Sequence, residues 1–86
     1  MSDNQTLPVE ILVKPIGYLA INQGTVDLHS GNGEVHTVSD DIMVFYEDTV
    51  VVNNAASGRI VFFNNLSEDI TFGPGDIVRL KDEVLI

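Results

Sequence analysis

The chain has 86 residues, 44% of them hydrophobic, which suits one domain with a small core. Thirteen acidic residues against four basic ones give a net charge of −9, which argues against nucleic-acid or anionic-membrane partners and favours a soluble monomer. There is no cysteine, so neither disulfides nor thiolate metal ligands can hold the fold together.

The N-terminal stretch MSDNQTLPVEILVKP lacks the basic region and the long apolar run of a secretory signal peptide. No stretch is apolar for long enough to insert directly into lipid. We expect residues 1–8 to form a flexible N-terminal segment and residues 9–86 to form a single domain. Val9, Ile11 and Val13 alternate with other residues, which predicts a first strand ending at Pro15.

Short strands and a hairpin are predicted in the next part of the chain. Residues 16–21 favour a strand over a helix, and residues 25–29 alternate with Val26 and Leu28 facing inward. Ser30-Gly31-Asn32-Gly33 is the strongest hairpin signal, because Asn and Gly supply the positive φ values of primed turns. Residues 34–38 are then expected to return antiparallel.

The middle of the chain contains two further apolar stretches. Residues 42–46, like residues 60–63, are apolar at consecutive positions, which favours strands packed between two layers. Residues 39–41 predict a turn, residues 49–52 are rich in β-branched side chains, and residues 53–58 form a loop that has room for one helical turn.

Residues 58–80 predict a three-stranded antiparallel meander. A polar turn at 64–69 follows the apolar strand, and Gly73-Pro74-Gly75-Asp76 forms a sharp corner before Ile77. No window shows helical periodicity over more than about one turn. The sequence therefore predicts an all-β fold, a small antiparallel β-sandwich or barrel of about seven to nine short strands without a long helix.

The two histidines could form a metal site. His29 and His36 flank the predicted hairpin turn, and with Asp27 or Glu34 they would make a two-histidine, one-carboxylate set. The alternative interpretation is that both are exposed polar residues. We therefore assign no metal ligand.

The acidic pairs do not match a calcium-binding loop, although weak calcium binding stays open as an alternative. We expect them to be solvated turn residues: Asp40-Asp41, Glu47-Asp48, Glu68-Asp69 and Asp82-Glu83. No catalytic motif is present, so the sequence predicts no enzyme, no catalytic residue and no cofactor. Five of the six aromatic residues are expected in the core, with Tyr46 left open.

From residue 16 onward the chain resembles the FecR-like β pattern, and most closely the N-terminal retention module of large adhesins that Gram-negative bacteria export by type I secretion. The resemblance covers about 65 residues and consists of strand and turn signals: Gly24-Thr25-Val26, Gly31-Asn32-Gly33, 35–38, Asp40-Asp41-Ile42, 48–52, 55–58, 59–63, 70–72, Gly73-Pro74-Gly75-Asp76 and 77–80.

The resemblance implies a physical stop. Such adhesins leave the cell C-terminus first, and the N-terminal module folds in the periplasm, where it is too wide for the outer-membrane channel. The implied partners are that channel and the rest of the adhesin chain, and the implied location is the periplasm at the outer membrane. Ala55-Ala56 lies between predicted strands, so the family's di-alanine protease site is not assigned to it.

Two other functions are compatible with the composition. One is a free-standing structural protein, such as a phage capsid-decoration or tail component. The other is a ligand-binding or carbohydrate-binding module, which exposed aromatic side chains would favour. A reading frame that continues past Ile86 into long repeats would support the adhesin interpretation over the phage one.

Overall fold

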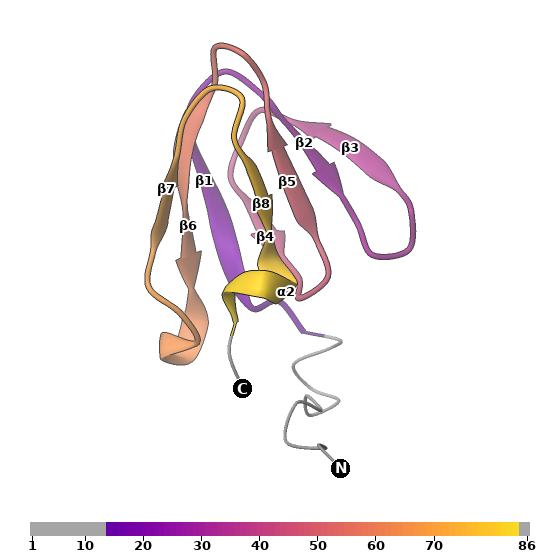
Figure 1. Ribbon diagram of the computed structural model, residues 1–86, viewed down its shortest axis with the longest axis vertical. Coiled ribbons are helices and arrows are strands. Elements are labelled where there is room, and N and C mark those ends of the chain that lie inside the picture. The colour runs from indigo at the N-terminus through magenta and orange to yellow at the C-terminus, as the bar shows by residue number, and fades with distance from the viewer. Residues whose placement is uncertain (1–13, 85–86) are drawn as a thin grey trace.

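A computed structural model of the protein describes residues 14–84, which form two four-stranded antiparallel sheets (Figure 1). Sheet A contains, in spatial order, β4 (Ile42–Val44), β1 (Gly17–Gln23), β6 (Ser57–Phe62) and β7 (Ile70–Phe72). Sheet B contains β3 (Val35–Val38), β2 (Val26–His29), β5 (Thr49–Val52) and β8 (Ile77–Arg79). The predicted all-β class is confirmed. The flexible segment 1–8 and the strand at 9–13 lie outside the described residues.

The chain crosses repeatedly between the two sheets. Within residues 14–84, only the β2–β3 and β6–β7 connections join neighbours in one sheet, and every other connection passes from one sheet to the other. The two central pairs, β1–β6 and β2–β5, therefore form from strands that are far apart in sequence. This interleaving ties both sheets into one cooperative unit.

Alternation along the strands builds one core between the sheets. In β2 the buried residues are Val26 and Leu28, as predicted, and Val50 and Val52 follow the same period in β5. The core consists of the following residues: Ile16, Leu19, Val26, Leu28, Val38, Val44, Val50, Val52, Ala56, Ile60, Phe62, Phe72, Val78, Leu80 and Val84.

The predicted meander over 58–80 is wrong in its last strand. β6 and β7 pair antiparallel, but β8 leaves sheet A and pairs with β5 in sheet B. Gly75 at the corner has a φ of +82°, and the N–H of Gly75 donates to the carbonyl of Val52 at 3.1 Å. The glycine-rich corner thus turns the chain across the sandwich and not back along the same sheet.

The expectation that residues 42–46 lie buried between two layers is also wrong. Among the strands of residues 14–84, β4 lies at the edge of sheet A with β1 as its one neighbour, and of its own residues only Val44 is buried. Met43 is 51% exposed, and Phe45, just after the strand, is 39% exposed. An edge position explains this, because an edge strand has a neighbour on one side alone.

The hairpin between β2 and β3 forms at the predicted place with a different turn. The N–H of Ser30 donates to the carbonyl of Glu34 at 2.8 Å, and the N–H of Gly33 donates to the carbonyl of Ser30 at 3.0 Å. Gly33 has a φ of +94°, whereas Asn32 has no positive φ. The loop is therefore a turn followed by a glycine bulge and not a primed two-residue turn. The hairpin extends away from the other strands in Figure 1.

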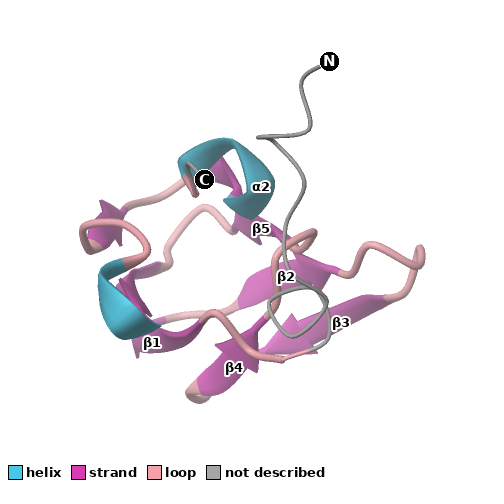
Figure 2. Cartoon of the chain, turned by 90° about the horizontal axis from the view of Figure 1, so that it is seen from below, coloured by secondary structure: helices cyan, strands magenta, loops and turns pink. Residues whose placement is uncertain are grey.

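Two helical segments lie at the same end of the sandwich (Figures 1 and 2). They are the 3₁₀ turn η2 (Phe63–Asn65) and the single α-helical turn α2 (Leu80–Glu83). Residues 14–84 include no helix long and apolar enough to cross a membrane. The helical turn suggested for 53–58 is not formed; a hydrogen-bonded turn occurs there instead, with the N–H of Ala56 donating to the carbonyl of Asn53 at 3.1 Å.

Candidate functional site

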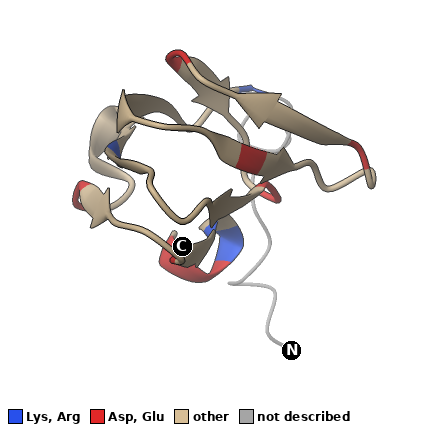
Figure 3. Ribbon diagram, turned by 90° about the horizontal axis from the view of Figure 1, so that it is seen from above, with Lys and Arg blue, Asp and Glu red and all other residues tan. Residues whose placement is uncertain are grey.

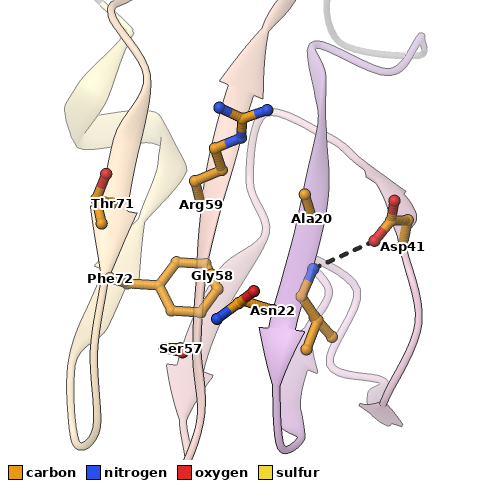
Figure 4. A pocket seen from close by; sticks show the side chains of 9 residues that line it. Ala20, Asn22, Asp41, Ser57, Gly58, Arg59, Thr71 and Phe72 are labelled. Carbon is orange, nitrogen blue, oxygen red and sulfur yellow. Dashed lines mark hydrogen bonds between the residues drawn. The ribbon is translucent and has the colours of Figure 1, made fainter.

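A hollow with a volume of about 520 Å³ lies on sheet A. It is open to solvent and draws its lining from β1, β6, β7 and the loop before β4 (Figure 4). Its side-chain lining includes Asn22, Asp41, Ser57, Arg59, Thr71 and Phe72. Residues from three strands and one loop therefore converge on this place.

Strand register places one row of this lining on the outer face of sheet A. Ala20 pairs with Arg59, and Arg59 pairs with Thr71 on the next strand. Directly paired residues point to the same side of a sheet, and the flanking Leu19 and Ile60 are buried in the core. Ala20, Arg59 and Thr71 consequently project away from the core.

Gly58 in β6 is a point of close approach beside the hollow. An added Cβ on Gly58 would collide with the carbonyl oxygen of Ala20 in β1 and would come 2.8 Å from the Phe72 ring. Gly58 is the register partner of Phe72, whose ring lies over it in Figure 4. The missing side chain lets β1 and the buried Phe72 ring approach Gly58 closely.

The polar groups around the hollow differ in their partners. Asp41 accepts a hydrogen bond from the N–H of Ile21 at 3.2 Å through Oδ1. That contact lies beside the register shift between Ile21 and Gln23, where the ladder between β1 and β6 is interrupted. Within residues 14–84, the side chains of Asn22, Ser57, Arg59 and Thr71 make no hydrogen bond to the protein.

An aromatic pair lies on the same outer face, one row away from Ala20. Tyr18 pairs with Val61 on one side and with the exposed Met43 on the other. The Tyr18 and Phe63 ring centroids are 6.2 Å apart, with the planes inclined by 39°. Both rings are half-buried. The expectation that five of six aromatic residues belong to the core is wrong, because only Phe62 and Phe72 are buried.

The histidines do not form the suggested metal site. His29 pairs with Val35, whereas His36 pairs with Leu28, so successive register positions put the two rings on opposite faces of the hairpin. His36 Nε2 lies 3.4 Å from Glu34 Oε1, and Thr37 donates to Asp27 at 3.0 Å. Residues 14–84 contain no cluster of three or more potential metal ligands.

One acidic residue differs from the expectation that the acidic pairs are solvated. Asp48 is only 5% exposed, and its Oδ2 accepts a hydrogen bond from the N–H of Phe45 at 2.9 Å. Burial raises the pKa of the Asp48 carboxyl above its ordinary value, and the Phe45 N–H bond opposes this to a smaller extent. The other described members of the acidic pairs are exposed, and Figure 3 shows acidic segments spread around the ribbon.

Asp48 lies beside a second, smaller hollow that two basic residues also line. Arg79 and Lys81 reach this hollow from the end of β8 and from α2, and Gly31, Glu47 and Thr49 also line it. The backbone of Asp48 also contacts α2, because the N–H of Leu80 donates to the carbonyl of Asp48 at 3.0 Å. Asp48 thus acts as a structural residue that links the β4–β5 turn to α2.

Sequence reasoning missed the hollow on sheet A and did not single out Asn22 and Ser57, which line it. Arg59, which also lines the hollow, is exposed. The signal that points to this place is Gly58 near the start of β6, because a glycine in a strand marks a close backbone approach. Ala56 is fully buried and Ala55 is exposed, so the di-alanine lies within the folded domain.

No protein family model, curated protein or solved structure matches this chain.

Proposed function

We propose that this domain is an N-terminal anchor that folds in the periplasm and stalls a type I-secreted adhesin in its outer-membrane channel. The supporting observation is the width of the folded domain. Its Cα atoms span 43 × 26 × 19 Å along the principal axes. A single extended strand needs a bore of only about 10 Å, judged from the spacing of strands and sheets. A channel that is only wide enough for an extended chain would stop this domain.

The construction of the fold suits that role. The core forms without disulfides, because the chain has no cysteine, and the interleaved strands of both sheets make local opening costly. A compact two-layer domain of this kind resists being pulled through a narrow opening for as long as it stays folded. Under this proposal, retention depends on folding and not on any catalytic group.

The test is a fusion of residues 1–86 to the N-terminus of a passenger that carries a C-terminal type I export signal. The passenger is expected to stay attached to the cell when the domain folds. Phe62→Ala removes a buried ring and is expected to release the passenger into the medium, whereas Phe45→Ala alters an exposed ring and should leave it attached. Retention by a variant shown to be unfolded contradicts the proposal.

A structural protein of a phage particle is the second candidate, favoured by the exposed apolar side chains. Val35, Met43 and Ile77 are each more than half exposed, and contacts between particle subunits would cover such residues. The length of the reading frame distinguishes the two candidate functions. A reading frame that continues from Ile86 into a long repeat region supports the anchor, and a stop codon at that point supports the particle protein.

A further inference from the structure

The hollow on sheet A is equipped with polar groups that the fold itself does not use. Asn22, Ser57, Arg59 and Thr71 line it and make no hydrogen bond to the protein within residues 14–84. They come from three neighbouring strands and surround the same space (Figure 4). Convergent polar side chains in a concave surface are the ordinary sign of a small-ligand site.

The charges around the hollow favour a neutral ligand. Arg59 supplies the only positive charge of the lining, and Asp41 supplies a negative one on the other side of Ala20. The chain as a whole carries a charge of −9, which repels polyanions. Arg59 in turn disfavours a cation. A neutral molecule with many hydroxyl groups can bind to both charged side chains, because a hydroxyl group can donate a hydrogen bond to Asp41 and accept one from Arg59 or Asn22.

Apolar surfaces complete the arrangement. Ala20 forms a small, flat part of the outer face, and Tyr18 lies two residues away on the same face. Two residues along a strand correspond to roughly 6.6 Å. The Tyr18–Phe63 pair therefore offers ring surface next to the polar hollow, at a distance suited to the C–H face of an adjoining unit of the same ligand.

We propose that the outer face of sheet A binds a neutral oligosaccharide. One sugar unit occupies the hollow, where Arg59, Asn22 and Asp41 hydrogen-bond its hydroxyl groups, and the next unit lies against Tyr18 and Phe63. This binding function goes beyond the anchoring role and does not depend on it, because anchoring requires only that the domain folds.

The test is an NMR titration of ¹⁵N-labelled protein, residues 1–86, with maltohexaose, cellohexaose and hexa-N-acetylchitohexaose. At least one of these neutral probes is expected to produce saturable shifts of the Ala20–Asn22 and Ser57–Arg59 amides at concentrations up to about 10 mM, the range of weak binding. Arg59→Ala and Asn22→Ala should each weaken that binding at least about tenfold, a loss of about 1.4 kcal/mol. Arg79→Ala, which lies on sheet B, should leave the dissociation constant unchanged.

Two results overturn the inference. One is the absence of saturable shifts with all three probes, and the other is binding that Arg59→Ala and Asn22→Ala leave intact in folded protein. An oligogalacturonate serves as the anionic comparison, and binding of this probe alone contradicts a neutral ligand. Folding of each variant is checked by its amide spectrum. The Arg59→Ala variant is also tested in the passenger fusion. If it loses oligosaccharide binding but still retains the passenger on the cell, the binding function is separate from the anchoring function.

Discussion

Asp48 and Asp76 occupy equivalent positions in two corners of the fold, yet one is buried and the other is exposed. The N–H of Phe45 donates to Asp48 Oδ2 at 2.9 Å, and the N–H of Gly73 donates to Asp76 Oδ2 at 2.8 Å. The backbone N–H of Asp48 in turn donates to the carbonyl of Phe45 at 3.1 Å, and the N–H of Asp76 donates to the carbonyl of Gly73 at 3.2 Å. Both corners carry the chain from sheet A to sheet B.

The segments around these aspartates repeat each other in sequence. Residues 42–52 read IMVFYEDTVVV and residues 70–80 read ITFGPGDIVRL, and buried apolar residues stand at matching positions in both. The matching pairs are Val44 with Phe72, Val50 with Val78, and Val52 with Leu80. The same pair of aspartate hydrogen bonds thus forms the β4–β5 corner and the β7–β8 corner, and only the β7–β8 corner contains glycine.

The burial of Asp48 predicts a pH-dependent contribution to stability. Because the folded-state pKa is raised, the folded protein binds the proton more tightly than the unfolded chain. The favourable contribution is therefore fully present below the unfolded-state value of about 3.8 and is lost as the pH rises through the higher folded-state pKa. Ionised Asp48 is thus expected to disfavour folding at neutral pH.

Comparison with Asp48→Asn isolates this effect. The amide oxygen can still accept the Phe45 N–H, while the group no longer titrates. Urea unfolding at pH 7 and pH 4 should show wild type gaining stability relative to the variant on acidification, since the effects of the other carboxyl groups occur in both proteins. A difference between the two proteins that does not change with pH contradicts the assigned shift.

Gly24 is expected to tolerate alanine less well than Gly33. Both have a positive φ, +78° and +94°, so alanine at either position costs about 1–2 kcal/mol from backbone strain. A Cβ at Gly24 would also lie 2.8 Å from Ala56 Cα, whereas a Cβ at Gly33 meets nothing within 4 Å. Overpacking adds about 1–3 kcal/mol to the loss for Gly24→Ala. Equal midpoints and slopes in urea unfolding for the two variants would show that Ala56 exerts no such constraint.

Phe62→Ala should destabilise the domain by about 3–5 kcal/mol, because it removes a large buried side chain and leaves a cavity. The matched change is Phe45→Ala, at a ring that is 39% exposed, and its cost should be smaller. Chemical unfolding followed by circular dichroism measures both. Costs of the same size would contradict the placement of the two rings.

Asn53 is expected to matter more than its neighbour Asn54. The Asn53 side chain donates from Nδ2 to Thr25 Oγ1 at 2.8 Å in a partly buried place, joining the β5–β6 corner to the β1–β2 corner. Asn53→Ala should cost about 0.5–1.5 kcal/mol, the usual net value of one such bond. Asn54 is exposed, and Asn54→Ala should stay within about 0.5 kcal/mol of wild type. Urea unfolding measures both variants. A lower unfolding midpoint for Asn54→Ala than for Asn53→Ala would argue against the hydrogen bond between Asn53 and Thr25.

Local pattern predicts part of this fold, and the remainder depends on long-range pairing. Period-two alternation placed Val26 and Leu28 inward, and Gly75 marks the corner that precedes β8. Which strand β8 would join could not be derived, because the corner's residues specify a change of direction but not the partner. Likewise the apolar content of residues 42–46 does not reveal that β4 is an edge strand.

The candidate site illustrates the same limit. Arg59 is one of four basic residues in the sequence, but Asn22, Asp41 and Thr71 come from separate segments that only the strand order brings together. Asp48 could not be distinguished from Asp76 by sequence, since both precede a β-branched strand. Burial of one of them depends on its neighbours in space, among them the α2 backbone at Leu80.

Passenger retention measured against domain stability tests the anchoring account most directly. Gly33→Ala, Gly24→Ala and Phe62→Ala provide a graded series of unfolding free energies in the fused protein. The account predicts that the passenger stays on the cell while the domain remains folded and appears in the medium once a variant is mainly unfolded. Release that bears no relation to unfolding free energy, or retention by an unfolded domain, would contradict it.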